Sequence, residues 1–377
     1  MVEIETLNDN ICFLDTYRNK KVLVTGNTGF KGSWLCVWLS ILGAKISGIS
    51  NGIPTSPSHF ESLQLKSEID CYDEDVRDLC KVKEVIDKFK PDFIFHLAAQ
   101  PLVRESYSDP VTTIETNVMG TMNVLEALRQ ANHKCTAIMI TSDKCYDNVE
   151  WLWGYRETDH LGGKDPYSAS KGAAELIIKT YSDSFFDKDE SNVKVASVRA
   201  GNVIGGGDWA KDRIVPDCIR SWSSDRVVEI RSPNATRPWQ HVLEPLSGYL
   251  LLGQILANDR DLNGEPFNFG PNANQNFTVK ELVSRMQRYW SGTKVNYAEN
   301  SDRSKKESGL LKLCCDKALH QLGWQPTLTF DETARFTVEW YRNFYSEKKD
   351  VYEMSSKQVE EYIQKASERG QIWVNSC

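Results

Sequence analysis

Short apolar runs alternate with longer amphipathic segments along the first 200 residues of the chain. Short runs with branched or aromatic side chains are typical of buried strands, and apolar positions with helical spacing indicate helices. Predicted strands cover residues 21–25, 45–49, 69–72, 91–100, 137–140 and 193–198. Predicted helices cover 33–42, 111–131 and a segment that ends near 186. This alternation predicts an α/β fold with a parallel, doubly wound sheet.

The pattern changes after Arg199, where the glycine-rich segment 199–209 is unsuited to a regular element. Shorter elements are predicted beyond it: helices at 214–222, 241–257, 278–290 and 329–345, and strands at 227–231 and 267–270. They indicate a smaller mixed α/β lobe. The predicted organisation is a lead-in at 1–18, a main domain at 19–200 joined by about 238–262, a second lobe at 201–237 and 263–347, and a tail at 348–377.

Composition and charge narrow the classes of function. The 377 residues are 40% hydrophobic and 26% charged, which is the composition of a folded chain with a full core. The formal net charge of −7 gives no electrostatic basis for binding nucleic acid. A local basic pocket for an anionic ligand remains compatible with this charge.

No apolar run approaches the roughly 20 residues that a membrane-spanning helix needs. The most apolar run, 249–257, is interrupted by Gly253 and Gln254, and the N-terminus lacks the basic-then-apolar pattern of a signal peptide. The ten cysteines include no CxxC pair, so we expect reduced thiols and no metal site. These features predict a cytoplasmic protein without a membrane partner.

A glycine-rich turn follows the first predicted strand and opens the first predicted helix. Gly26, Gly29 and Gly32 have the spacing GxxGxxG within residues 26–32. In this context the first glycine permits a tight turn, the second lets the backbone approach a pyrophosphate, and the third lets helix and strand pack closely. The turn therefore predicts a dinucleotide site in a Rossmann-type domain. An ordinary strand-to-helix turn is the alternative.

The next segments bear on which dinucleotide binds. Strand 45–49 is followed by Ser50-Asn51-Gly52, which offers neither the acid that holds an adenosine ribose nor an arginine for a 2′-phosphate. The missing basic residue favours NAD. Asp75 is a candidate acceptor for the adenine amine, or else part of a solvated acidic turn. Small residues near 98–99 would admit a cofactor, and Asn117 would cap or bend its helix or contact the central strands.

Ser142, Tyr167 and Lys171 provide the groups for oxidising an alcohol. Ser142 follows strand 137–140, at the edge where open α/β sheets bind ligands. Tyr167 and Lys171 are four residues apart, so they share one face of a helix. Tyrosine has an ordinary pKa of about 10, and Lys171 with a positive nicotinamide ring would favour the phenolate. Alone, this trio predicts an alcohol dehydrogenase or an epimerase.

Asp143 and Lys144 extend this chemistry to an elimination. Once a sugar C4 is a ketone, its C5 proton is acidic, and Lys144 in its neutral form would remove it. Asp143 in its protonated form would help the C6 hydroxyl leave as water. The hydride then returns to C6, so that the net reaction is a dehydration. The alternative is that Asp143 and Lys144 form an ion pair with each other.

Two further segments are candidates for a substrate pocket. The loop at 145–165 is rich in aromatic residues, and loops over a sheet edge often line such pockets. Packing between the lobes would explain these aromatic residues equally well. Arg231 and Arg237 are candidates to clamp a diphosphate, although surface arginines without a ligand are the simpler interpretation.

The glycine turn at 25–32, the acidic segment at 75–78 and the Tyr167–Lys171 pair resemble the extended short-chain dehydrogenase/reductase family, in its NAD-dependent epimerase/dehydratase branch. The resemblance covers about residues 18–345. Segments similar to the dehydratases of that family that act on CDP-D-glucose lie at 30–35, 98–104, 141–148, 197–212 and 237–245. Dehydratases for other nucleotides usually carry Asp-Glu in place of Asp143-Lys144.

The resemblance implies NAD as cofactor, CDP-D-glucose as substrate, a 4-keto-6-deoxy product for surface polysaccharide, and a homodimer through helices of the nucleotide-binding domain, or a dimer of dimers. It assigns catalysis to Ser142, Asp143, Lys144, Tyr167 and Lys171. Implied cofactor contacts are Gly26, Thr28, Gly29, Phe30, Lys31, Gly32, Asp75, Val76, Leu97, Ala98, Ala99, Asn117, Tyr167 and Lys171. Implied substrate contacts are Gln100, Arg104, Asn202, Arg237 and His241.

This chain departs from the family pattern at Asn51-Gly52, where the family tends to have an acid, so the cofactor has to be supplied if it is held weakly. Three alternatives remain, of which the first is a 4,6-dehydratase for another nucleotide sugar. A nucleotide-sugar 4-epimerase would share Ser142, Tyr167 and Lys171 without needing Asp143-Lys144. A non-catalytic dinucleotide sensor would tend to lose the Tyr or Lys of the YxxxK pair, and both are present here.

Overall fold

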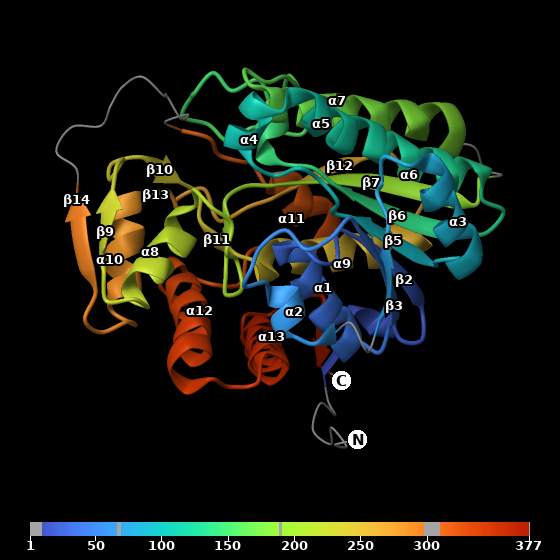
Figure 1. Ribbon diagram of the computed structural model, residues 1–377. Helices are drawn as coiled ribbons and strands as arrows, with labels where there is room; N and C mark the ends of the chain where they lie inside the picture. Colours follow the sequence, from blue (N-terminus) through green and yellow to red (C-terminus); the bar gives the residue numbers. More distant parts are fainter. Residues whose placement is uncertain (1–9, 66–68, 188–190, 298–309, 377) are drawn as a thin grey trace.

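The structure is a computed structural model that describes residues 10–65, 69–187, 191–297 and 310–376. Its centre is a seven-stranded sheet in the order β12-β7-β6-β5-β2-β3-β4, in which every neighbouring pair is parallel (Figure 1). The strands are β2 (Lys21–Thr25), β3 (Lys45–Ser50), β4 (Asp70–Asp73), β5 (Phe93–His96), β6 (Cys135–Ile140), β7 (Val193–Ala200) and β12 (Pro266–Phe269). The predicted α/β class and doubly wound sheet are confirmed.

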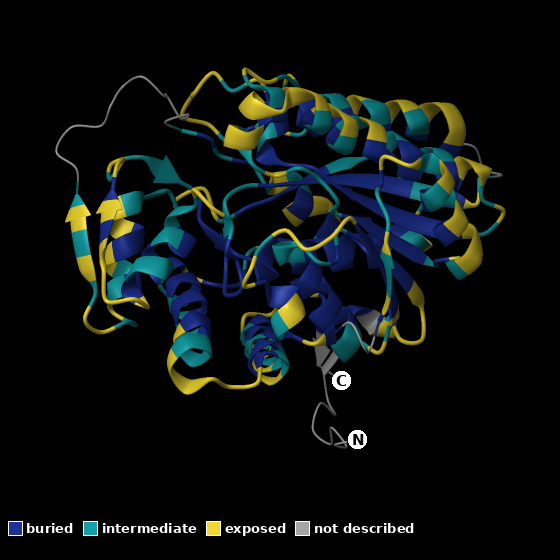
Figure 2. Ribbon diagram, viewed as in Figure 1, coloured by how far each residue is buried: buried dark blue, intermediate teal, exposed yellow. Residues whose placement is uncertain are grey.

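Helices cover both faces of this sheet, which is why its inner strands are apolar on both sides. On one face lie α3 (Leu79–Phe89), α6 (Gly120–Gln130) and α7 (Pro166–Tyr181), and their core includes Leu125 and Ile178. On the other lie α1 (Phe30–Ile41) and α9 (Leu243–Asn258), whose core includes Trp38 and Leu250. Figure 2 shows the strands between these two layers almost wholly buried.

The smaller lobe lies beside one end of the sheet (Figure 1). In it β9 pairs in parallel with β14, and β10 pairs with β13 in the antiparallel sense. Its elements are α8 (Ile214–Trp222), β9 (Val227–Ile230), β10 (Thr236–Arg237), β13 (Phe277–Thr278), α10 (Val279–Gln287), β14 (Lys294–Tyr297) and α12 (Phe330–Arg342). Helices α10 and α12 each begin with a threonine capping box, as their sequences Thr-x-x-Glu favour.

Shorter elements complete the described chain: β1 (Asn10–Cys12), α2 (His59–Ser62), α4 (Val103–Ser108), α5 (Pro110–Ile114), β8 (Val203–Ile204), β11 (Gln240–His241), α11 (Asp316–Leu322), α13 (Val351–Glu368) and β15 (Val374–Ser376). Helix α9 packs against β6 and β7, so this later segment belongs physically to the sheet. Strand β12 pairs with β7, although the sequence analysis assigned it to the second lobe. Apolar periodicity identifies a strand without naming its partner. The remaining domain boundaries stay a prediction.

The segments predicted as a lead-in and a tail are built into the fold. Strand β1 pairs with β15, and Trp373 stacks on Phe13 with ring centroids 5.0 Å apart. Helix α13 packs against α1 through a buried face that includes Val359 and Tyr362. The residues 1–9 of the predicted lead-in, and 298–309 of the predicted second lobe, lie outside the described residues.

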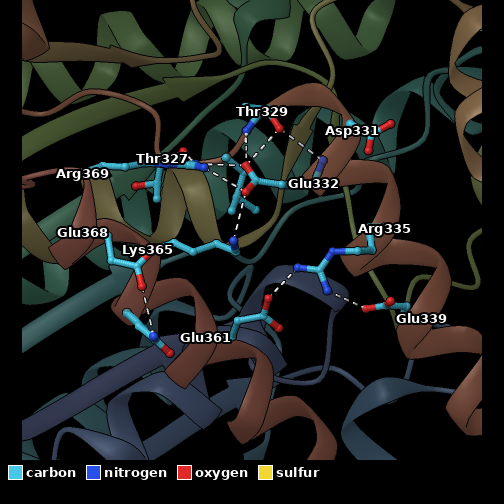
Figure 3. Close-up of polar contacts among 12 residues, drawn as sticks. Thr327, Thr329, Asp331, Glu332, Arg335, Glu339, Glu361, Lys365, Glu368 and Arg369 are labelled. Atoms are coloured by element: carbon cyan, nitrogen blue, oxygen red, sulfur yellow. Dashed lines mark hydrogen bonds and ion pairs between the residues drawn. The ribbon is translucent and has the colours of Figure 1, made fainter.

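Polar contacts fix α13 to the start of α12 (Figure 3). Glu332 caps α12 together with Thr329 and also accepts hydrogen bonds from Arg369 (2.8 Å) and Lys365 (3.0 Å). Arg335 of α12 reaches Glu361 of α13 at 2.5 Å. These contacts hold the C-terminal helix in one orientation against both lobes. No helix in the described ranges has the length and apolar content needed to cross a membrane.

Candidate active site

The turn after β6 carries the first group of predicted catalytic residues. Strand β6 is buried throughout, and a 3-10 turn over Asp143–Cys145 follows it. Ser142 begins this turn: its Oγ accepts from the Lys144 N–H (3.3 Å) and donates to Asp143 Oδ1 (3.0 Å). Ser142 and Asp143 are buried, whereas Lys144 is half-buried. The turn therefore lies at the carboxyl edge of the sheet, as predicted.

Helix α7 brings the second group of residues to the same edge. Asp165 caps its first turn by accepting from the Ser168 N–H (2.9 Å), and Pro166 fits the first helical position. Tyr167 and Lys171 are buried on one face of α7, and the Tyr167 side chain is hydrogen-bonded to Ser142. The structure thus brings Ser142, Tyr167 and Lys171 together.

Asp143 and Lys144 do not neutralise each other. Within the described part of the chain, no ion pair joins them, so the alternative of a simple ion pair is not realised. Asp143 Oδ2 is buried and, among the described residues, has no hydrogen-bond partner. A Cβ placed on Gly201 would lie 3.1 Å from this oxygen, so a larger side chain at position 201 would crowd it. Asp143 therefore offers one unoccupied carboxylate oxygen close to Tyr167.

The electrostatics of the pair on α7 are set mainly by burial. Burial raises the pKa of Tyr167 to about 12, Asp143 adds to this effect, and the hydrogen bond with Ser142 opposes it. Burial also lowers the pKa of Lys171 to about 8, against the carboxylate of Glu175, which raises it. Tyr167 alone is therefore protonated at neutral pH. Nearby positive charge is what would make it a base.

Two cations face this site that the sequence analysis did not place there. Burial, the charge of Arg213 and that of Lys171 lower the pKa of Lys31 to about 8, while Asp143 opposes the shift. Arg213 is held by Asp208 (2.8 Å) and also acts on Tyr167. Lys31 was predicted only as a cofactor contact and Arg213 was not predicted. Spacing in the sequence carries no signal for either placement, because they come from α1 and from the loop before α8.

The glycine turn has the geometry that a pyrophosphate needs. Gly26 has a φ of 74°, and a Cβ on it would lie 2.8 Å from the Ala98 nitrogen. A Cβ on Gly32 would overlap the Gly26 carbonyl oxygen. Helix α1 begins without a side-chain cap, which leaves its first N–H groups for an anion. These residues fit the phosphates of a dinucleotide.

The loop after β3, where the adenosine of a dinucleotide is predicted to bind, is closed by local hydrogen bonds. Asn51 donates to Asp75 (2.7 Å), and the Gly52 N–H donates to Asp73 (2.9 Å). Hydrogen bonds from Arg77 hold the pKa of Asp75 below its ordinary value, so this carboxylate is ionised. Thr28 donates to the Gly52 carbonyl (2.9 Å). The contact of Asp75 with adenine remains a prediction.

The side chains of Asn117 and Gln100 form hydrogen bonds with other groups of the protein. Asn117 lies in a π-helical turn at Glu115–Met119, between α5 and α6. Its side chain accepts from the Gln100 N–H (2.8 Å) and donates to Ser170 Oγ (2.8 Å), so it ties the loop after β5 to α7. Gln100 uses its amide on Leu102 and Thr113. Direct ligand contacts from either side chain stay a prediction.

The other predicted substrate residues are dispersed. Arg104 forms an ion pair with Asp212 (2.6 Å) across the two lobes, and Arg237 donates to the carbonyl of its neighbour Thr236. The carbonyl of Asn202 accepts from Gln240. His241 is fully buried next to Trp34 and Phe336, and burial lowers its pKa to about 3. Its placement gives no support for a contact with substrate.

The aromatic loop divides into a packed part and an exposed part. Tyr146 and Tyr155 are buried and stacked, with centroids 5.1 Å apart. Leu152 and Trp153 are 78% and 72% exposed. Packing therefore accounts for the two tyrosines. His96 on β5 is buried between Thr25 and Thr121 and contacts both through its ring nitrogens.

Comparison with known proteins decides the family. A sequence profile described as GDP-mannose 4,6 dehydratase matches residues 23–337. A CDP-glucose 4,6-dehydratase of Salmonella typhimurium is 45% identical over 350 residues, covering 92% of this chain and 97% of the relative. The chain belongs to the nucleotide-sugar 4,6-dehydratase family. This confirms the family and the hydro-lyase class that the sequence predicted. Solved proteins of the same fold are described with NAD bound, as the predicted cofactor requires.

More distant relatives agree with the fold of this 4,6-dehydratase family member. A dTDP-glucose 4,6-dehydratase of Haemophilus influenzae is 26% identical and covers 85% of this chain and 97% of its own. A solved UDP-glucose 4-epimerase of Thermus thermophilus in complex with NAD superposes with a TM-score of 0.72 at 24% identity, over 85% of this chain and 99% of that one. Dehydratases and epimerases thus share this architecture, and the residues of the site must distinguish them.

Proposed function

We propose that the chain converts CDP-D-glucose into CDP-4-keto-6-deoxy-D-glucose and water. The observation that carries this proposal is the turn Ser142-Asp143-Lys144 set against Tyr167 and Lys171, with one oxygen of Asp143 unoccupied. An epimerase needs the serine, tyrosine and α7 lysine alone. The similarity to a CDP-glucose 4,6-dehydratase supports the choice of nucleotide.

The first step is oxidation at C4 of the glucose. Tyr167 takes the proton of the C4 hydroxyl, and Ser142 holds the same oxygen by a hydrogen bond. Lys171 lies one turn along α7 and stabilises the phenolate of Tyr167 by its charge. When bound in the glycine turn, NAD supplies the site that accepts a hydride from C4 and later returns it to C6.

The second step is elimination across C5 and C6. Lys144 removes the C5 proton, which the C4 ketone has made acidic, and Asp143 delivers a proton to the departing C6 hydroxyl. With hydride returned to C6, the Lys144 ammonium gives its proton back to C5, which completes the 6-deoxy sugar. Their positions suit this division. Asp143 is buried, and its Oδ2 has no hydrogen-bond partner among the described residues. Lys144 is half-buried, so part of its side chain is exposed toward the solvent.

An assay with defined substrates tests this function. Purified protein is mixed with CDP-glucose and NAD, and the 4-keto-6-deoxy product is measured, with UDP-, GDP- and dTDP-glucose and a reaction without added NAD in parallel. Product from CDP-glucose alone is the expected result, and the reaction without NAD shows whether the cofactor stays bound. Interconversion of gluco and galacto sugars without a keto product would instead establish an epimerase. Inactivity with every sugar would favour a dinucleotide sensor.

We also propose that the protein is a homodimer. Large apolar side chains are exposed on consecutive segments of one face: Tyr107 on α4, Val111 and Ile114 on α5, and Met119 just before α6. A second copy of the chain would cover them, as the family resemblance implies.

Light scattering of the wild type against Val111→Asp tests this proposal of a homodimer, since the variant should be monomeric. A cytoplasmic location and a role in surface polysaccharide stay predictions.

A further inference from the structure

A buried carboxylate on α7 has no part in the reaction steps proposed above. Glu175 follows Lys171 by one helical turn and Tyr167 by two, so the three side chains share one face. Glu175 is only 4% exposed. A carboxylate at this depth is costly unless several donors or cations compensate it.

Three side chains from the two neighbouring strands bind Glu175. Its Oε2 accepts from Ser197 Oγ (2.8 Å) and from Arg199 (2.7 Å), both on β7. Its Oε1 accepts from the hydroxyl of Thr141, the residue that directly precedes Ser142. The carboxylate therefore ties the helix with the catalytic tyrosine and lysine to the strand end with the catalytic turn.

Arg199 extends this network to the aromatic loop and, through it, to β12. It donates to the Tyr146 hydroxyl (2.7 Å) and to the Glu157 carbonyl (3.1 Å). The Tyr146 hydroxyl in turn donates to Asn268 on β12 (2.9 Å). The side chains of Arg199 and Glu175 are each 3% exposed, so the pair is shielded from water. One ion pair thus connects α7, three strands of the sheet and the aromatic loop.

Stability alone does not account for this pair. Two charges buried together lose so much hydration that apolar residues of similar volume are often as stable or more stable. Burial opposes ionisation of Glu175, but Arg199 and the hydroxyl donors outweigh it and hold the pKa of the carboxyl below its ordinary value. The carboxylate of Glu175 is therefore ionised at neutral pH and places a negative charge beside the other groups of α7.

The negative charge acts on Lys171. Burial lowers the pKa of Lys171 to about 8, and Glu175 is the largest influence that opposes this. From other elements, the titratable groups that act on Lys171 or respond to its charge are Cys145 after β6, Lys31 on α1 and His96 on β5. His96 is neutral through burial and Lys31 is repelled, which leaves Glu175 as the stabilising carboxylate among the described groups.

We propose that Glu175 is a positioning residue for the dehydratase reaction, which holds α7 against the catalytic turn and keeps Lys171 in its ammonium form beside Tyr167. The inference rests on the proposed function for its substrate. Lys171 is charged below its pKa and loses its charge as pH rises through it. Without Glu175 that loss occurs at lower pH, and with it goes the stabilisation of the Tyr167 phenolate.

The test compares pH profiles of kcat/KM for CDP-glucose in the wild type and in Glu175→Gln. We expect the alkaline limb of the variant to move down by about one pH unit, the size of shift that a neighbouring charge causes. Asp183→Asn is the matched control, because it removes an exposed carboxylate just beyond the same helix, and its profile should coincide with that of the wild type.

Two further variants separate positioning from folding. Glu175→Gln/Arg199→Met removes both charges, so it folds without an unpaired cation, and its alkaline limb should remain shifted. A wild-type profile in this double variant would overturn the proposal. Thr141→Val keeps all charges and breaks the tie to the catalytic turn, so kcat should fall several-fold with the limb unmoved. A wild type that makes no keto product would refute the proposed function instead, whatever the variants do.

Discussion

At the scale of single residues, the three side chains of the turn after β6 differ in their hydrogen bonds and in their burial. Ser142 is fixed between Asp143 and the backbone of Lys144, so its hydroxyl is oriented before substrate arrives. Asp143 is buried and uses one oxygen, while Lys144 is half-buried. The group proposed to hold the C4 oxygen is thus fixed in place, whereas the proposed C5 base is partly exposed.

The role of Lys144 is tested by Lys144→Ala. Loss of the C5 base should lower the rate of product formation by about 100-fold or more, the ordinary contribution of a general base, while C4 oxidation continues. Product yield and the signal of reduced cofactor in the first turnover measure the two steps. Lys164→Ala is the control, since Lys164 is an exposed lysine that binds the carbonyl of Asn148 in the neighbouring loop. Unchanged product yield in Lys144→Ala would rule out this role.

The role of Asp143 as the acid is tested with a leaving group that needs no proton. Asp143→Asn should eliminate water from CDP-glucose about 100-fold more slowly or worse. Fluoride leaves C6 of the 6-deoxy-6-fluoro substrate without protonation, so the variant should process that compound at close to the wild-type rate. Fluoride release and keto-sugar formation report the outcome. An equal loss with both substrates would show that Asp143 acts in some other way.

At the scale of elements, the sequence predicted those parts that depend on local pattern. Helix α8 occupies the predicted residues 214–222, and the six predicted strands of the first domain are all present. The helix predicted at 111–131 instead contains a π-helical turn around Asn117, because that side chain serves the Gln100 backbone. Helix α13 lies in the segment predicted as a tail, because a single amphipathic helix does not reveal from its own sequence which surface its buried face covers.

In the candidate site, too, the sequence predicted only what local pattern determines. Ser142 and Tyr167 could be placed together because parallel strands end, and the helices that follow them begin, at the same edge of the sheet. Lys31 was predicted only as a cofactor contact, and Arg213 and Glu175 were not predicted, because their surroundings in the site come from segments distant in the sequence. The ligand contacts of His241 and Gln100 were inferred from a family motif, which marks a region without stating where each side chain points.

The close approach between α1 and β2 is tested by Gly32→Ala. The added methyl group would overlap the Gly26 carbonyl, so the helix must shift, at a cost of about 1–3 kcal/mol in the free energy of unfolding. The shift also displaces the N–H groups expected to bind phosphate. Chemical denaturation and NAD binding should both weaken. Gly292→Asn serves as control, because asparagine tolerates its φ of 74° and nothing lies within 4 Å of the added Cβ; equal losses in both variants would contradict the argument.

At the scale of the whole molecule, Glu244 joins three regions. It lies fully buried in the first turn of α9 and accepts from Thr327 and Leu328, which precede α12, and from Tyr362 of α13 (2.9, 2.5 and 2.9 Å). Burial raises the pKa of Glu244 to about 7. The packing of α13 onto α9 therefore depends on whether Glu244 is protonated.

The sign of this linkage follows from the raised pKa. Below about pH 4.5 the carboxyl is protonated in both folded and unfolded chains, and between there and pH 7 the folded chain binds more protons. The free energy of unfolding should fall across that window by about 3 kcal/mol from this group. Urea denaturation at several pH values measures it. Glu244→Gln should lose this part of the slope, and the exposed cap variant Glu281→Gln should keep it; identical slopes in all three would refute the assignment.

The pairing of β1 with β15 has a consequence for the order of events during synthesis. Residues 10–12 are made early and residues 374–376 late, so the early strand waits at the ribosome until its partner has emerged. Phe13 likewise waits for Trp373. Until then the apolar segment around Phe13, which packs against α1, is not covered by the C-terminal residues. A chaperone that binds apolar segments could bind there. In a nascent chain that stalls before residue 373, Phe13 would lack the ring of Trp373 that stacks on it.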